Sequence, residues 1–262
     1  GPMTKRQAVR DAALAGSAVV ALATRAGRRR PRLGVALAAG GALAAWGAFG
    51  ASSPVFGRPL RSGPRWRARA ALTFDDGPGP STAAVLDALA GEGVRATFFV
   101  LGRQVERRPH EVRRMVAEGH EVASHGYDHG ILVFRGPRHV ADQLRRTEQA
   151  VARAAGFGVL SPLFRAPHGF RGPATLAAAR RAGYRTVSWT RGVFDSADPG
   201  AGVIAARVAR ALVPGAVILL HDADGWDPER ERVQTAEAVP AICAAARQRG
   251  IELVTLEELL SG

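Results

Sequence analysis

Two adjacent carboxylates, Asp75 and Asp76, lie directly after the apolar run 70–74 and are followed by Gly77 and Pro78. Two like charges in a tight turn are unfavourable unless a cation or a proton relieves their repulsion. An acidic surface turn is the simplest interpretation of such a pair taken alone. Because this pair follows a strand pattern, it could instead end a buried strand and bind a cation.

Two histidines, His125 and His129, follow a second strand pattern at 121–124. One aspartate and two histidines four residues apart form a three-ligand set for a divalent metal that leaves open coordination positions. If one aspartate of the pair at 75 and 76 binds the ion, the other is a natural base. A zinc site built from cysteines is excluded, because Cys243 is the only cysteine.

The elements that must position these residues alternate from residue 70 onward. The predicted strands are 70–74, 95–100, 121–124, 162–165, 185–189, 216–220 and 251–254, and the predicted helices are 81–91, 109–118, 138–155, 173–183, 202–212 and 233–249. The strand patterns lack period-2 alternation, as expected of parallel strands covered on both faces. The pattern predicts a distorted (β/α)7-type parallel barrel, closed or nearly so, with a doubly wound open sheet as the alternative.

Side chains capable of chemistry fall at the ends of these predicted strands. They are Asp75 and Asp76 after the first strand, His125 after the third, Arg165 after the fourth, Trp189 after the fifth and His221 after the sixth. The carboxyl ends of barrel strands build the active site of barrel enzymes. The sequence therefore predicts one active site at that rim.

These motifs resemble those of the polysaccharide deacetylases (NodB-like, carbohydrate esterase family 4) over roughly residues 68–260. The run Thr-Phe-Asp-Asp-Gly at 73–77 matches the first family motif, which implies that Asp75 is the general base and Asp76 a metal ligand. The second motif implies that His125 and His129 are the other two ligands. The implied cofactor is one divalent ion, Zn²⁺ first, with Co²⁺ or another transition metal possible.

The third family motif, Arg-x-Pro, is present as Arg165-Ala166-Pro167. Arg165 is expected to pair with Asp75. The resemblance implies that the next residue, His168, supplies the backbone N–H that holds the oxyanion, at a position where the family usually has Tyr.

The fifth family motif, Leu-x-His, matches the run from Leu219 to His221 and implies that His221 is the general acid. The fourth motif matches weakly at 195–199. By that alignment Asp198 orients His221, although Asp195 could do so instead. Proline replaces the motif's Trp at position 199.

The missing Trp leaves the hydrophobic wall of the acetyl pocket to other residues, for which Trp189 and Trp226 are the candidates. A second departure is Gly126, where the family prefers Ser or Thr after the first metal-binding histidine.

The residues together predict a metal-dependent amide hydrolase that removes the N-acetyl or another N-acyl group from an amino-sugar glycan. Asp75 would take a proton from water, and His221 would give one to the leaving amine. The His-x-aromatic-Asp-His form at 125–129 also resembles deacetylases and deformylases of polyprenyl-phosphate-linked amino sugars. Two alternatives are a degenerate domain that binds glycan or lipid without turnover, and a non-haem iron oxygenase, which would leave Asp75 and His221 without roles.

Charge separates the chain into two predicted regions, 1–66 and 67–262. The net charge is +13, and residues 1–69 hold 13 Lys and Arg but one acidic residue. A basic tail beside a nearly neutral domain favours a membrane surface over nucleic acid as the partner. The stretch Leu33–Phe56 is uncharged for 24 residues, long enough to span a bilayer at roughly 20 residues per crossing.

The first region is therefore predicted to be a membrane anchor and the second a deacetylase domain, with a disordered or cleaved leader as the alternative for the tail. More basic residues precede the stretch than follow it, which places the catalytic domain on the extracytoplasmic side. If the apolar segment 12–24 also spans, as one arm of a hairpin, the domain stays cytoplasmic.

Overall fold

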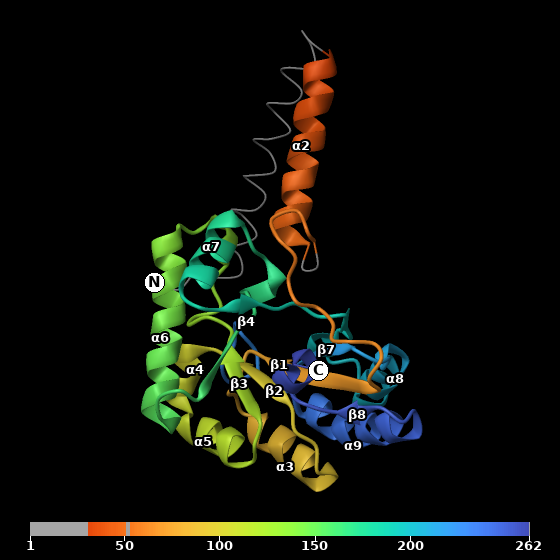
Figure 1. Cartoon of the computed structure of the whole chain (residues 1–262). Helices are drawn as coiled ribbons and strands as arrows, with labels where there is room; N and C mark the ends of the chain where they lie inside the picture. Colours follow the sequence, from red (N-terminus) through yellow and green to blue (C-terminus); the bar gives the residue numbers. More distant parts are fainter. Residues whose placement is uncertain (1–30, 51–52, 262) are drawn as a thin grey trace.

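The computed structural model describes residues 31–50 and 53–261. A central sheet is surrounded by helices, and one helix, α2 (Pro31–Phe49), projects away from this body (Figure 1). The predicted apolar segment 12–24 lies outside the described residues. All side chains predicted to carry chemistry lie within them.

The sheet pairs its named strands in parallel throughout. They are β1 (Arg69–Asp75), β2 (Thr97–Val100), β3 (Glu121–Ser124), β4 (Leu160–Phe164), β5 (Arg185–Thr186), β6 (Arg191–Gly192), β7 (Val217–His221) and β8 (Glu252–Leu253). Their order is β5-β4-β3-β2-β1-β7-β6, and β8 pairs with β1 off this path. This parallel half-barrel is consistent with the predicted distorted (β/α)7-type barrel, and its two edge strands, β5 and β6, have only two residues each.

Helices occupy the connections between strands. Besides α2 they are α3 (Thr82–Glu92), α4 (Gly102–Arg107), α5 (Pro109–Ala117), α6 (Pro137–Ala155), α7 (Pro173–Arg181), α8 (Ala201–Ala211), α9 (Val233–Gln248) and α10 (Leu256–Leu260). Three 3₁₀ turns are η1 (Leu132–Phe134), η2 (Pro167–Gly169) and η3 (Asp195–Ala197). The six predicted helices are present within a few residues, whereas α4, α10 and the strand β6 were not predicted, because elements this short show no hydrophobic period.

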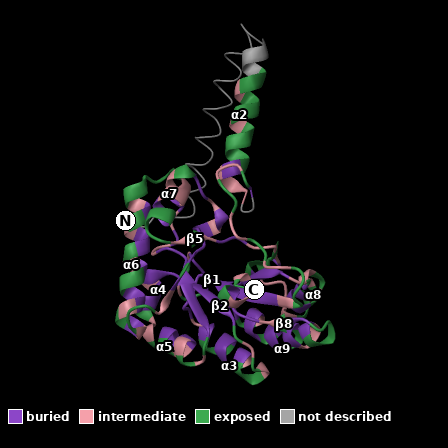
Figure 2. Ribbon diagram, viewed as in Figure 1, coloured by how far each residue is buried: buried purple, intermediate pink, exposed green. Residues whose placement is uncertain are grey.

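Alternate residues of β1 face two different cores. Leu72 and Phe74 pack in the outer core between the sheet and its helices, whereas Ala71 packs inside the half-barrel against residues of α10. Successive side chains of a strand point to opposite faces, so Thr73 and Asp75 share the inner face with Ala71. Figure 2 shows the resulting layers, with buried strands inside and the helices exposed on their outer sides. Asp75 therefore ends β1 inside the half-barrel.

Strand register brings distant residues of the predicted site together. Asp75 on β1 pairs in register with Phe99 on β2 and with His221 on β7. His125 follows β3, and Arg165 follows β4. Because all these strands run in the same direction, their carboxyl ends meet at one edge of the sheet.

Residues 60–63 cross the open side of the half-barrel. Leu60 forms a bridge with Val187, which follows β5, and Ser62 forms a bridge with Ala216, which precedes β7. The sheet thus gains contacts from residues before the predicted domain start at position 67, and that boundary stays a prediction.

Helix α2 covers most of the stretch predicted to span a membrane. Several of its apolar side chains are exposed, among them Val35, Leu43 and Trp46. Within residues 31–50 and 53–261, however, no helix combines the length and apolar character needed for a bilayer crossing. The predicted transmembrane span is therefore not supported.

Candidate active site

A cavity of about 520 Å³ opens at the carboxyl ends of the strands. The predicted residues that line it are Asp75, Asp76, His125, His129, His168, Trp189, Asp195, Leu219, His221 and Trp226. Arg165 and Pro167 are buried behind this lining. Side chains from separate loops thus converge on one space, as the strand-end argument predicted.

Asp76, His125 and His129 form a compact buried set whose ligand atoms all lie within 4.8 Å of one another. Asp76 Oδ1 is 3.4 Å from His125 Nε2 and 3.0 Å from His129 Nε2. It is buried without a hydrogen-bond partner. Although burial acts to raise it, the pKa of Asp76 is held well below its usual range by the two histidines. An orphaned carboxylate oxygen between two imidazole nitrogens fits a divalent cation.

The neighbouring backbone fixes the orientation of these ligands. His125 Nδ1 lies 2.8 Å from the Arg165 carbonyl oxygen, which leaves Nε2 as the nitrogen that faces Asp76. The other oxygen of Asp76, Oδ2, accepts a hydrogen bond from the Gly225 N–H at 3.1 Å. A side chain at position 225 would collide with the His129 ring, 2.3 Å from Nδ1. Gly225 therefore both holds one ligand and makes room for another.

Backbone strain is concentrated at the cavity. Asp76 (φ 78°), His129 (φ 61°), His168 (φ 60°) and Phe194 (φ 55°) all adopt positive φ and all line it. Such conformations are costly for residues other than glycine and persist where the surrounding structure holds them. The surrounding packing thus holds these unfavourable backbone conformations in the cavity lining, as is common at functional sites.

Asp75 forms a buried ion pair with Arg165. Arg165 Nη1 donates to Asp75 Oδ1 at 2.6 Å and to the Thr73 hydroxyl at 2.8 Å. The guanidinium lies over the Phe99 ring, 4.1 Å from its centroid. Asp75 Oδ2 lies 3.8 Å from His125 Nε2. The carboxylate is thereby fixed beside the candidate metal site with one oxygen facing it.

His221 is held by Asp195. Its Nδ1 lies 2.9 Å from Asp195 Oδ1, and its backbone N–H donates to Asp195 Oδ2 at 2.7 Å. Thr235 donates to the same Oδ2 at 3.0 Å. Burial acts to lower the pKa of His221, but the carboxylates of Asp195, Asp76 and Asp75, with Asp195 first among them, together outweigh it and raise the pKa to about 10. His221 therefore carries a proton at neutral pH.

The expectation from the fourth motif that Asp198 orients His221 is corrected by this geometry. Asp198 pairs instead with Arg230, and with Arg232 at 3.1 Å. It directly follows η3 with φ 51°, and its carboxylate contacts the exposed Arg230 and the buried Arg232 rather than His221. Asp195 is the carboxylate that contacts the histidine.

Trp226 and His168 form an aromatic wall beside the metal ligands. Their rings stack at 5.3 Å with an interplanar angle of 21°, and each also contacts the His129 ring. Burial, followed by the neighbouring His129, lowers the pKa of His168 to about 3, so its imidazole is neutral. Trp189 lines the cavity near Leu219. Both candidates for the missing Trp thus border the cavity.

Sequence reasoning missed a second layer of residues. Asp222 is fully buried behind the cavity, accepts a hydrogen bond from Thr82, and lies so close to Gly77 that any side chain there would collide with it. Asp224 pairs with the buried Arg232 at 2.7 Å, and both line the cavity. The only sequence signal for Asp222 was its position directly after His221.

Comparison with known proteins agrees with this geometry. The family model described as polysaccharide deacetylase matches residues 63–187. A chitooligosaccharide deacetylase of Bradyrhizobium sp. (strain ANU 289) is 41% identical over 197 residues, which cover 72% of this chain and 89% of the relative.

Two solved structures share the fold. A peptidoglycan N-acetylglucosamine deacetylase has a TM-score of 0.71 at 31% identity and covers 77% of this chain and 92% of its own. A carbohydrate esterase family 4 pseudoenzyme from Bacillus anthracis has a TM-score of 0.69 at 26% identity, covering 79% of this chain and 69% of its own. The chain belongs to the polysaccharide deacetylase family, because it is 41% identical to the chitooligosaccharide deacetylase over 89% of that relative.

Proposed function

We propose that this protein is a metal-dependent amide hydrolase that removes the N-acetyl group from N-acetylglucosamine units of a glycan. The observation that carries the proposal is that the Asp76–His125–His129 set, the Asp75–Arg165 pair and the His221–Asp195 pair all border one cavity. Each supplies a different requirement of amide hydrolysis, and an oxygenase would use only the first.

Asp76, His125 and His129 are the proposed ligands of one divalent ion, most simply Zn²⁺. When bound, such an ion polarises the amide carbonyl and lowers the pKa of a water molecule toward about 7. The two Nε2 atoms face the carboxylate oxygen that lacks a partner. Nitrogen and oxygen donors of this kind also suit Co²⁺ and other transition metals.

Asp75 is the proposed general base. Its Oδ1 is tied to Arg165, which leaves Oδ2 to accept a proton from the attacking water on the side of His125. Because Arg165 is itself fixed by Thr73 and by the Phe99 ring, the carboxylate is held in one orientation.

His221 is the proposed general acid. An amine leaves an amide readily only after its nitrogen gains a proton, and His221 lies in register with Asp75 on the adjacent strand. Nδ1 is engaged by Asp195, so Nε2 is the nitrogen available to donate. Asp195 favours the protonated imidazole before the transfer.

The loop from Pro167 to His168 is the proposed oxyanion site. A backbone N–H there would stabilise the negative charge that develops on the carbonyl oxygen. Trp226 stacked on His168, together with Leu219 and Trp189, offers an apolar surface for the acetyl methyl group.

Two relatives guide the choice of substrate class. One is named a chitooligosaccharide deacetylase and the other a peptidoglycan N-acetylglucosamine deacetylase. Both names specify N-acetylglucosamine glycans, which we extend to this chain. A polyprenyl-phosphate-linked amino sugar is the second candidate substrate. Membrane attachment and an extracytoplasmic location stay predictions.

The similarity to a family pseudoenzyme supports the alternative that this chain binds glycan without turnover. The candidate base, acid and metal ligands are all present in this chain and converge in one cavity, which favours turnover. The two possibilities differ in whether acetate is released.

The test is a screen for acetate release from chitooligosaccharides, peptidoglycan and a polyprenyl-phosphate-linked acetamido sugar, and for formate release from the corresponding lipid-linked formamido sugar. Wild-type protein loaded with Zn²⁺ is compared with Asp75→Asn as the background. We expect acetate release from at least one N-acetylglucosamine glycan, abolished in the variant. Binding of these glycans without acetate or formate release would instead establish the degenerate domain.

A further inference from the structure

The loop from Pro167 to Arg171 faces the active site on one side and helix α2 on the other. His168 contacts the His129 ring at 4.3 Å between centroids and stacks on Trp226. Two residues later, the Phe170 ring meets Phe49 of α2 edge-on, at 5.1 Å and 88°. His168 and Phe170 contact each other at 5.4 Å. Aromatic rings therefore form a continuous series of contacts from Phe49, at the carboxyl end of α2, to the candidate metal ligand His129.

Arg171 fastens the same loop to the chain around the end of α2. Its backbone N–H donates to the Ala48 carbonyl at 3.0 Å, and its guanidinium donates to the Ser53 carbonyl at 2.5 Å. The side chain is buried, with 2% of its surface exposed. The last carbonyls of a helix need partners from outside it, and here the active-site loop supplies one.

The backbone of this loop needs support. His168 adopts φ 60° and ψ 3°, a left-handed conformation that is unfavourable for histidine and persists only where surrounding contacts enforce it. On the catalytic side His168 borders the open cavity. On the other side Phe170 and Arg171 contact α2 and the residues that follow it, so the loop is also supported from there.

We propose that Phe49 is a positioning residue for the active site: through Phe170 it holds His168 against Trp226 and His129. The carboxyl end of α2 thus helps to position the active-site loop. Phe49 precedes the segment matched by the family model, which begins at residue 63, so this support is built from sequence outside the matched segment. The kinetic part of the inference rests on the proposed deacetylase function, whereas the structural part does not.

The structural part is tested by chemical labelling of His168 in the full-length chain. Trypsin releases residues 166–171 as the peptide Ala-Pro-His-Gly-Phe-Arg, in which His168 is the only histidine. Diethylpyrocarbonate modification of this peptide, measured by mass spectrometry, should rise several-fold in Phe49→Ala. Leu43→Ala is the matched control, because Leu43 is an exposed apolar residue of the same helix. It should label like wild type.

The kinetic part uses the same variants. Phe49→Ala should lower kcat/KM for acetate release by roughly fivefold or more at unchanged zinc content, and Phe49→Tyr should restore most of it. Should Phe49→Ala fail to fold, Phe49→Leu, Phe170→Leu and the double variant replace it. If Phe49 acts through Phe170, the double variant should be no worse than the poorer single one, because coupled sites are not additive.

Wild-type labelling and kinetics in Phe49→Ala, or additive losses in the double variant, would overturn the inference. If no variant and no wild-type protein releases acetate while the labelling still follows Phe49, the proposed function fails and the positioning role stands. If the wild type releases acetate but substitution of Phe49 leaves the labelling of His168 unchanged, the proposed function stands and the positioning role fails.

Discussion

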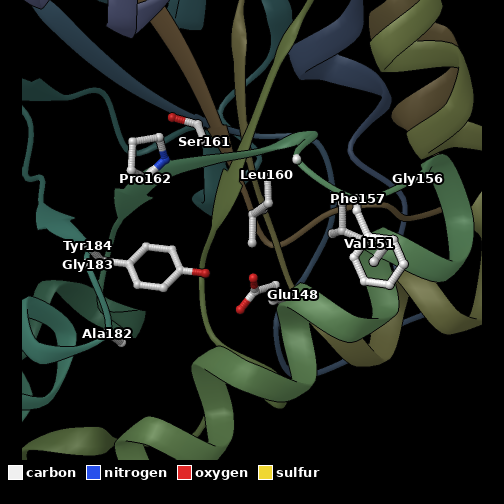
Figure 3. A pocket seen from close by; sticks show the side chains of 12 residues that line it. Glu148, Val151, Gly156, Phe157, Leu160, Ser161, Pro162, Ala182, Gly183 and Tyr184 are labelled. Carbon is white, nitrogen blue, oxygen red and sulfur yellow. The ribbon is translucent and has the colours of Figure 1, made fainter.

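Two cavities lie at opposite ends of the strands of the same parallel sheet. The larger, about 520 Å³, opens where the strands end, and the smaller, about 180 Å³, lies where β4 and β5 begin. Figure 3 shows the smaller one, with the Tyr184 hydroxyl and the Glu148 carboxylate pointing toward each other across it. Both cavities contain a carboxylate and an aromatic ring.

The two cavities differ in the titratable side chains that line them. Burial, followed by the charge of Glu148, raises the pKa of Tyr184 to about 12, so it stays a neutral phenol. The lining of this cavity includes no histidine and no buried ion pair among the described residues. The larger cavity has a candidate metal-ligand set and two ion pairs, Asp75–Arg165 and His221–Asp195, so a cavity alone does not indicate catalysis.

Asp75→Asn should break the larger cavity's chemistry most severely. Without a carboxylate to accept the proton from water, kcat should fall by about 10²–10⁴-fold. The metal ligands are untouched, so zinc content measured by mass spectrometry should stay at the wild-type level. A variant that loses zinc together with activity would instead place Asp75 among the ligands.

His221→Ala should reduce acetate release from a glycan by about 10²-fold, because the leaving amine is no longer protonated. An aryl acetate has a leaving group that needs no proton. On that substrate the loss should be much smaller, as followed by absorbance of the released phenol. Equal losses on both substrates would mean that His221 is structural.

Asp195→Asn and Asp198→Asn compare the two carboxylates near the acid. Loss of the group that orients His221 should cost roughly 10–100-fold in kcat, by analogy with other orienting partners. Asp195 raises the pKa of His221, so its removal lowers that pKa. The acid is active when protonated, and the alkaline limb of the kcat profile should therefore move to lower pH.

Asp198→Asn is the matched control, because Asp198 pairs with arginines at the rim. It should leave the position of the alkaline limb unchanged and alter kcat only a few-fold. A shift of the limb in Asp198→Asn but not in Asp195→Asn would restore the assignment made from sequence.

Glu148→Gln and Tyr184→Phe should have the smallest effect, less than about twofold on kcat/KM. Neither residue borders the larger cavity, and each variant preserves the size of the side chain. Acetate release and thermal melting are measured together. A tenfold loss of activity with unchanged melting would mean that the smaller cavity contributes to function.

The position of most candidate site residues in one cavity could be predicted because they lie at or just beyond the ends of predicted strands. Asp75 and His221 follow apolar runs and His125 follows the short strand pattern at 121–124, and parallel strands bring such ends together whatever the details of closure. The extent of closure of the barrel did not follow from these patterns. It depends on the edge strands β5 and β6, whose pairing is set by tertiary contacts rather than by any hydrophobic period.

The partner of His221 could not be read from motif spacing. Asp195 begins the 3₁₀ turn η3 and Asp198 directly follows it, and the direction of each side chain depends on backbone angles that the sequence does not specify. Likewise, Gly225 approaches Asp76 from a loop about 150 residues away. Contacts of this kind follow from the folded arrangement of loops, which local patterns do not encode.

Deacetylation by this protein is proposed to require a divalent ion held by Asp76, His125 and His129. The most direct measurement is acetate release by wild-type protein after chelator treatment and after stepwise addition of Zn²⁺, with His125→Ala measured in parallel. Activity should be lost on chelation and return as one equivalent of zinc binds per chain, and His125→Ala should bind zinc weakly and stay inactive. Full activity in zinc-free protein, or in His125→Ala without bound metal, would contradict this proposal.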